Sequence, residues 1–353
     1  MKSLNTRMLV LLLAMECTAA SGRTIYVDDD GPADFSTIQS AIDDSNDGDT
    51  IIVQPGLYQE LVEYHGKNIT LTSTNPGDFD VVAATIIDYT VAFVGTEDAN
   101  CILTGFKINY RISGHGTHAT ISHCLLFGNI VSWGTVIRSC DGTISNCVVA
   151  DNIPAGDAIG PSIEGCHGLI KNCTVANNIR GIRVLSGSTT TIENCIIYGG
   201  NGIRVEGGAT VNILYSDVEI IYGGGSINLG QGNINTNPLF VRVKDPFVAF
   251  NGDYHLKSQA GRWDANEGRW TIDEVTSPCI DAGNPNSPLG YEPFPNGGRI
   301  NMGAYGGTIQ ASKSYFGRPP CEIIIAGDIN GDCRINFLDF QIIALHWLRD
   351  ESQ

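Results

Sequence analysis

Apolar and polar positions follow a six-residue pattern that recurs along the middle of the chain. Each copy reads apolar, variable, turn residue, small or apolar, variable, apolar. Six copies occur, at residues 103–108, 121–126, 144–149, 170–175, 192–197 and 213–218. Their third positions are spaced by 18, 23, 26, 22 and 21 residues. A period in this range predicts a solenoid, in which each repeat stacks on the one before it.

The third position of each copy interrupts the alternation expected of a single strand. Its occupants are Gly105, His123, Asn146, Asn172 and Asn194, with Tyr215 as an exception. Gly, Asn and His tolerate a positive φ, so each copy is predicted to form two short strands joined by a one-residue left-handed bend. Stacking would then place the asparagines in a ladder and the next residues in an inward column, spaced by about 4.8 Å. That column is Cys124, Cys147, Cys173 and Cys195.

These repeats resemble the right-handed parallel β-helix of the pectin lyase-like superfamily; a sandwich with irregular strands is the alternative. A helix with Ser36 as its N-cap is expected ahead of the coils, with Ile38, Ala41 and Ile42 on its apolar face. With the Gly48-Asp49 and Pro55-Gly56 turns that follow, it resembles the N-terminal cap and first coil of pectinesterases. A cap is needed because the open end of a stacked core exposes apolar surface and unpaired strand edges.

The chain is expected to divide into five segments. They are a signal peptide at 1–21, a parallel β-helix at 22–240, a closing region of the β-helix at 241–316, a linker at 317–320 and a calcium module at 321–353. The closing region resembles the one found at the C-terminal end of many exported bacterial β-helix proteins. The predicted fold class is therefore all-β, a right-handed parallel β-helix solenoid with an N-terminal helical cap and a short C-terminal α-helical calcium-loop module.

The first residues combine a positive start with a short apolar run at 8–15, which is typical of a secretory signal and too short to cross a bilayer. We therefore expect a secreted, extracellular or cell-surface protein without membrane insertion. The formal net charge of −17 argues against nucleic acid as a partner, because no basic patch offsets it. An acidic polysaccharide would need bridging cations or a local basic groove.

The chain has eleven cysteines, and ten remain once a leader that contains Cys17 is removed. An even number in an exported protein suggests disulfides. The inward column, and a second stack of Cys140 and Cys166, instead indicate buried small apolar residues. Neighbouring coils lie within disulfide reach, so one or two bridges remain an alternative.

A calcium loop is predicted at residues 328–339, where oxygen ligands fall at the spacing that a seven-coordinate cation requires. Its ligands are Asp328, Asn330, Asp332, the carbonyl of Arg334, Asn336 and Asp339. With the helical run that follows, the loop resembles one repeat of a type I dockerin, which implies Ca²⁺ binding and a cohesin-like partner. The chain departs from that pattern in having Cys333 where Gly is usual and one repeat where a dockerin has two. A disulfide between Cys321 and Cys333 would offset the first departure.

Catalytic residues cannot be identified from the sequence. Gly114-His115-Gly116 resembles a polygalacturonase motif, but the paired-Asp motifs that should precede it are missing, which favours a turn. An outward stripe is the candidate substrate-binding surface: Arg138, Glu164, Arg183, Arg204 and Glu206. Its cations could grip sugar carboxylates, or the stripe could be solvated cross-coil ion pairs. Trp263 and Trp270 could form a sugar platform or pack a loop.

Three functions follow from these observations. The first is an exported protein that binds plant or algal, pectin-like polysaccharide and takes part in its breakdown. The second is a polysaccharide lyase or glycosidase with unrecognised catalytic residues, and the third is a structural surface or adhesion protein. The dockerin resemblance supports the second by analogy alone.

Overall fold

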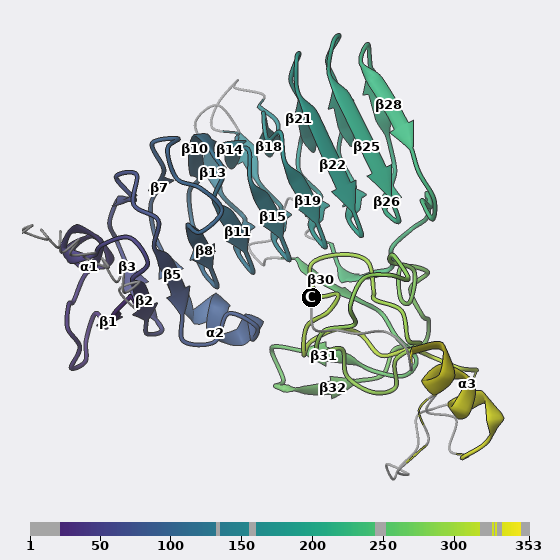
Figure 1. Ribbon diagram of the computed structural model, residues 1–353. Helices are drawn as coiled ribbons and strands as arrows, with labels where there is room; N and C mark the ends of the chain where they lie inside the picture. The colour runs from purple at the N-terminus through teal and green to yellow at the C-terminus, as the bar shows by residue number, and fades with distance from the viewer. Residues whose placement is uncertain are drawn as a thin grey trace, which may run out of the picture.

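The computed structural model describes residues 22–131, 135–154, 160–243, 252–317, 327, 329 and 334–346. Most of the chain winds through three parallel sheets, so that successive coils stack along one axis (Figure 1). Sheet A holds β1 (Thr24–Val27), β2 (Thr50–Val53), β5 (Thr70–Ser73), β8 (Ile102–Thr104), β11 (Thr120–Ser122), β15 (Thr143–Ser145), β19 (Leu169–Lys171), β22 (Thr189–Glu193), β25 (Thr210–Leu214) and β28 (Ser226–Leu229).

The other two sheets complete each coil. Sheet B holds β3 (Gly56–Tyr58), β6 (Thr85–Ile87), β9 (Lys107–Ile108), β12 (Leu125–Phe127), β16 (Val148–Ala150), β20 (Thr174–Ala176), β23 (Ile196–Tyr198) and β26 (Asp217–Val218). Sheet C holds β4 (Val62–Glu63), β7 (Val91–Ala92), β10 (Ile112–Thr117), β14 (Ile137–Cys140), β18 (Ile163–Glu164), β21 (Ile182–Val184), β24 (Ile203–Val205) and β27 (Ile221–Gly223). A short pair, β13 (Ile130–Val131) and β17 (Ile153–Pro154), extends two coils.

The predicted bend is present in every copy of the six-residue pattern. Its φ values are 84° at Gly105, 50° at His123, 50° at Asn146, 47° at Asn172, 53° at Asn194 and 45° at Tyr215. The ladder of asparagines has one rung, in which Asn194 Nδ2 donates to Asn172 Oδ1 at 3.0 Å. Asn146 does not join it, because its Nδ2 donates to the carbonyls of Ala304 and Gly306 at 3.0 and 2.8 Å.

The cysteine column is also confirmed. All eight cysteines of the described residues are buried and unbridged: Cys101, Cys124, Cys140, Cys147, Cys166, Cys173, Cys195 and Cys279. Within the column each thiol donates to the carbonyl two residues earlier, at 3.2 Å in all four cases. The thiols thus fill the core as small apolar groups with a weak donor that is satisfied locally. Cys17, Cys321 and Cys333 lie outside the described residues.

A second asparagine ladder, not anticipated from the sequence, turns the corner between sheets B and C. It consists of Asn129, Asn152 and Asn178, which are 3–4 % exposed. Their Nδ2 atoms donate to the carbonyls of Ile108, Leu126 and Val149 at 3.1, 2.8 and 2.7 Å. These side chains satisfy carbonyls that the turn removes from strand pairing, which a buried corner requires.

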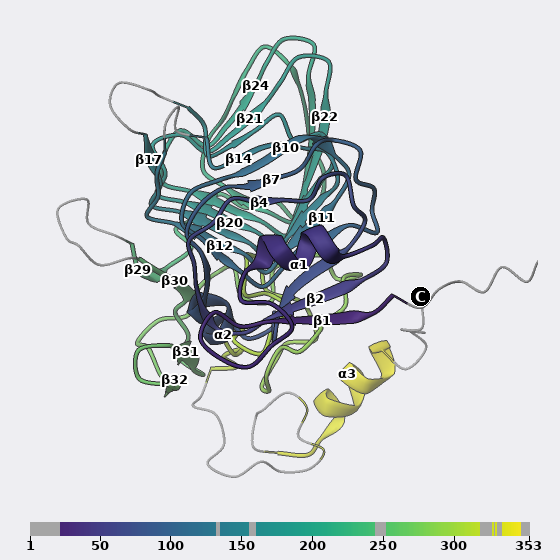
Figure 2. The same ribbon diagram turned by 90° about the vertical axis from the view of Figure 1, so that its left-hand side faces the viewer.

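Helix α1 (Ile38–Asp44) lies across the N-terminal end of the coils (Figure 2). The residues on its inward face, Ile38, Ala41 and Ile42, are fully buried, as the apolar pattern predicted. The N-cap is Thr37 rather than Ser36, since the Thr37 hydroxyl accepts from the Ser40 amide at 3.3 Å. A second short helix, α2 (Phe79–Ala84), leads directly into β6, the second strand of sheet B.

Residues 252–316, which we call the lateral lobe, lie along the side of the coils (Figure 1). The lobe contains β30 (Asp253–Leu256), which pairs with β29 (Phe240–Arg242), and the hairpin β31 (Arg262–Asp264) and β32 (Arg269–Thr271). It shares an apolar cluster with sheet B that includes Leu125, Val148, Ile196, Tyr254 and Met302.

The described part of the lobe therefore packs against sheet B and not over β28, the last strand of sheet A. The four residues of β28 are all exposed, including Ile227 at 37 % and Leu229 at 63 %. Beyond the lobe, helix α3 (Phe337–His346) carries several exposed apolar side chains. Among the described residues no helix is long and apolar enough to cross a membrane.

We predict that Asn172→Val lowers the free energy of unfolding by about 1–3 kcal/mol, because a β-branched residue is costly at a φ of 47°. Asn172→Gly is the matched control, since it loses the same hydrogen bond from Asn194 but tolerates the bend. Chemical denaturation measures both. Equal losses for Val and Gly would show that the hydrogen bond, and not the bend, sets the requirement.

Candidate functional site

The predicted outer stripe exists as a register on sheet C. Arg138 of β14 aligns with Glu164 of β18, then with Arg183 of β21 and Arg204 of β24. Glu206 follows β24 and turns back to Arg183. The structure thus brings all five predicted residues together on one outer face.

Ion pairs within the stripe occupy its central cation. Arg183 Nη1 lies 2.9 Å from Glu164 Oε1, and Arg183 Nε donates to Glu206 Oε1 at 2.9 Å. The hydrogen bond to Glu206 raises the pKa of Arg183, and the same bond lowers the pKa of Glu206. Arg138 Nε is 3.6 Å from Glu164 Oε2, while Arg204 is exposed and pairs with no described residue. Arg183 is therefore held in ion pairs between coils, which was the alternative interpretation of the stripe. Arg204 is the cation of the stripe that remains available to contact a ligand.

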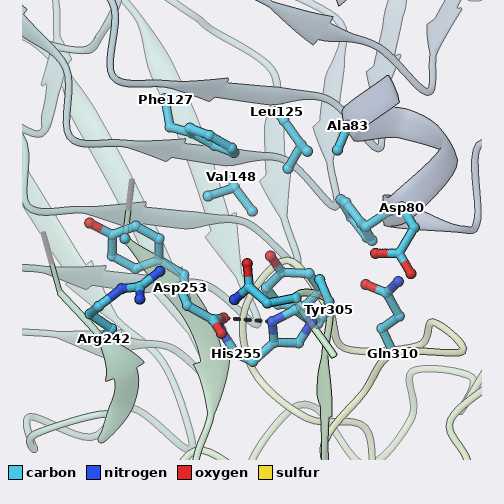
Figure 3. A pocket seen from close by; sticks show the side chains of 15 residues that line it. Asp80, Ala83, Leu125, Phe127, Val148, Arg242, Asp253, His255, Tyr305 and Gln310 are labelled. Atoms are coloured by element: carbon cyan, nitrogen blue, oxygen red, sulfur yellow. Dashed lines mark hydrogen bonds and ion pairs between the residues drawn. The ribbon is translucent and has the colours of Figure 1, made fainter. Parts of the chain in front are cut away.

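A deeper candidate lies where the lateral lobe meets sheet B. A cavity of about 310 Å³ separates α2 and strands β12 and β16 from β30 and the lobe (Figure 3). Phe79 and Phe127 border it from the coil side, and Tyr305 borders it from the lobe. Phe79 and Tyr305 meet edge to face, with ring centroids 4.8 Å apart. Apolar rings thus line a hollow that opens to solvent at the exposed residues Asp80 and Asn266.

A histidine and an aspartate of β30 form a hydrogen-bonded pair at the floor of this cavity. His255 Nδ1 lies 2.7 Å from Asp253 Oδ1, and the imidazole stacks on Tyr305 with centroids 3.7 Å apart. Burial acts to raise the pKa of Asp253, but the hydrogen bonds from the His255 ring and amide outweigh it, and the net shift is downward. Asp253 is therefore a carboxylate that accepts the Nδ1 proton and fixes the orientation of the ring.

Two buried polar atoms of the cavity lining have no hydrogen-bond partner among the residues that the structure describes: His255 Nε2 and Gln310 Oε1. Their residues are 4 % and 3 % exposed. With Nδ1 directed at Asp253, the neutral imidazole presents Nε2 as an acceptor, and the Gln310 carbonyl is an acceptor as well. Leaving such groups unpaired costs about 1–3 kcal/mol each, so the cavity is suited to a molecule that brings O–H or N–H donors.

The lobe is held over this cavity by contacts with the coils. Tyr254 Oη donates to Asp151 Oδ1 at 2.5 Å, and the Gly252 amide donates to Asp151 Oδ2 at 3.0 Å. At the other side Trp263 Nε1 donates to Asp80 Oδ2 at 3.1 Å. Asp151 and Asp80 thus fix β30 and the β31–β32 hairpin relative to sheet B.

Sequence reasoning missed the cavity because its residues are far apart in the chain. The segment from Asp253 to Leu256 lies within the predicted closing region, but no repeat connects it to Asp80 or Gln310. The one signal in the sequence is the spacing of two residues. A histidine two residues from an aspartate on a strand places both side chains on one face.

Two other candidates have structural roles. His115 has a φ of 51° and its Nδ1 lies 2.7 Å from the carbonyl of Phe93, which makes it a turn residue. Trp263 and Trp270 pack edge to face at 5.9 Å on the hairpin, and Lys313 Nζ lies 4.2 Å above the Trp270 ring. The tryptophans therefore pack the hairpin instead of forming a flat platform.

The predicted calcium loop is described in part. Asp328, Asn330 and Asp332 lie outside the described residues, while Arg334, Asn336 and Asp339 lie within them. Asp339 is 2 % exposed, and its carboxylate accepts from the amides of Ile329 and Asn336 at 2.8 and 2.7 Å. The last predicted ligand is thus buried, with both carboxylate oxygens bonded to backbone amides.

Comparison with known proteins supports the fold. Residues 92–244 match the family described as "Right handed beta helix region", and residues 211–283 match "Disaggregatase related". With the three parallel sheets, the first match identifies the fold as a right-handed parallel β-helix, as the repeats predicted. No curated protein matches the chain.

Two solved structures are similar at low identity. Pectate lyase Pel9A is 15 % identical, with a TM-score of 0.37, over 81 % of this chain and 96 % of that one. Pectin methylesterase from Aspergillus niger is 14 % identical, with a TM-score of 0.36, over 62 % of this chain and 91 % of that one. At these values neither structure bears on the activity of this protein.

We predict that Arg183→Ala lowers the free energy of unfolding by about 1 kcal/mol, because it leaves Glu164 and Glu206 as unbalanced neighbouring carboxylates. Arg204→Ala, one coil further along the same register, should leave stability unchanged. Denaturation at low and high salt measures the difference, which should shrink as salt screens the carboxylates. Equal stability of the two variants at low salt would refute a structural role for Arg183.

Proposed function

We propose that the protein binds a polysaccharide, and that one sugar unit occupies the cavity between sheet B and the lateral lobe. The observation that carries the proposal is the pair of unpartnered acceptors, His255 Nε2 and Gln310 Oε1, in a cavity bordered by aromatic rings. A sugar offers hydroxyl donors around its edge and C–H groups on its faces. It therefore meets both requirements of the lining at once, in the manner of a mostly apolar pocket with a few placed polar groups.

The site also suits a unit within a longer chain. Asp80 and Asn266 are exposed at the rim while Gln310 and His255 are buried within, so a polymer could enter without complete enclosure. The lining carries charges of both signs, with Arg242 facing the same cavity as Asp80 and Asp253, so both neutral sugars and uronates suit the site. Arg204 remains the alternative contact for an acidic polysaccharide.

A second candidate function is polysaccharide cleavage, and the Asp253–His255 pair is the observation that favours it. A carboxylate on Nδ1 leaves Nε2 as a general base, and abstraction of a sugar C–H proton or activation of water needs such a group. Formation of unsaturated uronic products would indicate a lyase, and new reducing ends without unsaturation would indicate a hydrolase. Binding without either product supports the binding function alone.

We further propose that the protein is exported and that its C-terminal loop binds Ca²⁺. The side chains of Asp328, Asn330, Asp332, Asn336 and Asp339 and the carbonyl of Arg334 would hold the ion. The buried carboxylate of Asp339 supports the assignment. A cohesin-like partner for this module stays a proposal that depends on the loop.

We predict that His255→Phe and Gln310→Leu each weaken oligosaccharide binding by about tenfold or more, since each removes one acceptor while keeping most of the volume. Isothermal titration against a panel of neutral and acidic oligosaccharides measures the affinity, and melting temperatures confirm folding. Arg204→Ala is the control and should bind as wild type. Loss of binding in Arg204→Ala with normal affinity in the two cavity variants would transfer the site to sheet C.

We predict that Ca²⁺ binds the full-length protein with measurable heat and increases its helical signal, and that Asp328→Ala abolishes both effects. Glu322→Ala, a charge-matched change ahead of the loop, should titrate as wild type. The measurements are calorimetry and circular dichroism on chelator-treated protein. Absence of heat and of any spectral change in the wild type would exclude the calcium loop.

A further inference from the structure

The last coil of the β-helix ends in core residues that no described part of the chain covers. Ile227 and Leu229 of β28 are in register with Val211 and Ile213 of β25, which are fully buried. Because the register is the same, Ile227 and Leu229 occupy inward positions, yet they are 37 % and 63 % exposed. A hollow of about 500 Å³ opens beside them, lined by apolar residues that include Val218, Ile221 and Ile234.

The outer strand of sheet A at this end is also unprotected. Ser226 and Gly230 direct their amides to the carbonyls of Ala209 and Ile213, both at 2.8 Å. The alternation of hydrogen-bonding direction along a strand then turns the amides of Ile227 and Leu229 to the uncovered side. Natural edge strands are usually protected by Lys, Pro or a bulge, and β28 has the sequence Ser-Ile-Asn-Leu.

Charged groups are sparse at this end of the described structure: Glu219 lines the hollow, but its Oε2 accepts from the Gly199 amide of the preceding coil at 2.8 Å. Residues 220–241 contain no Asp, Glu, Lys, Arg or His, although the whole chain has a net charge of −17. Like charge opposes contact between copies of an acidic protein. A last coil with few charged residues weakens that repulsion at this one surface, which suits contact with a second copy of the same chain.

The opposite end of the stack cannot serve as the partner surface. There α1 covers the first coil with its apolar face, on which Ile38, Ala41 and Ile42 are fully buried. Head-to-tail stacking of copies would need that end to be open. Contact between two C-terminal ends needs only the surface that is exposed, and a two-fold axis closes it after two copies.

We propose that the protein forms a tail-to-tail homodimer through its last coil. The β28 strands of the two copies pair along their free edges, and Ile227 and Leu229 of each copy fill the hollow at the end of the other. The two solenoids then share one continuous core. Each copy then covers the exposed end of the other, which the lateral lobe does not cover.

Sedimentation velocity of the full chain over about a hundredfold range of concentration tests the proposal. The wild type should be a dimer that dissociates on dilution. Leu229→Lys and Ile227→Lys should raise the dissociation constant at least tenfold, because each places a charge at the axis of the contact. Both side chains are exposed in the single chain, so the variants should fold, and melting curves at low concentration verify this.

Ile272→Lys is the matched control, since Ile272 is 61 % exposed on the lateral lobe, away from the last coil. It should dimerise as wild type. A wild type that stays monomeric throughout would overturn the proposal, as would equal weakening by Ile272→Lys. An open series of larger species would contradict the two-fold arrangement. Hydrogen exchange that shows the β28 amides protected in a monomer would instead assign the cover to another segment of the chain.

Discussion

Six successive coils of this protein turn from sheet A into sheet B at a single residue of positive φ, and the rest of the structure depends on that bend. A residue at φ of about 50° shifts the inward phase by one, so the side chain after the bend points into the core again. Cys124, Cys147, Cys173 and Cys195 occupy that position in four successive coils. If one bend failed, the strands beyond it would present their polar face to the core.

The same bends position the lateral lobe, and through it the cavity. Asn194 accepts two hydrogen bonds from the lobe. Its side-chain Oδ1 accepts from the Asn284 amide at 2.7 Å, and its backbone carbonyl accepts from the Gly303 amide at 2.8 Å. Asn146 bonds two further carbonyls of the lobe. Positive φ exposes these backbone and side-chain groups at one corner, which is where the lobe docks. The residues that shape the solenoid therefore also set the distance between Tyr305 and Phe79 across the cavity.

Features that repeat with the coil could be predicted from the sequence, and features built once could not. The bends, the cysteine column and the register of Arg138, Glu164, Arg183 and Arg204 all follow from one period. The ladder of Asn129, Asn152 and Asn178 repeats too, but it lies at turns of variable length outside the six-residue pattern. The cavity joins His255 to Gln310 and Phe79 by packing alone, and the side-on docking of the lobe was likewise not encoded in any local spacing.

The cysteine column makes the order of events during folding matter. Burial raises the pKa of Cys124, Cys147 and Cys173 well above the usual thiol range, so the closed coils contain almost no reactive thiolate. The same cysteines in an unfolded chain are ordinary thiols, about one coil apart and free to pair with the wrong neighbour. An oxidant that arrives before the coils close traps non-native loops, whereas one that arrives afterwards meets an inert core. Recovery of folded protein from denaturant therefore depends on keeping a reductant present until stacking is complete.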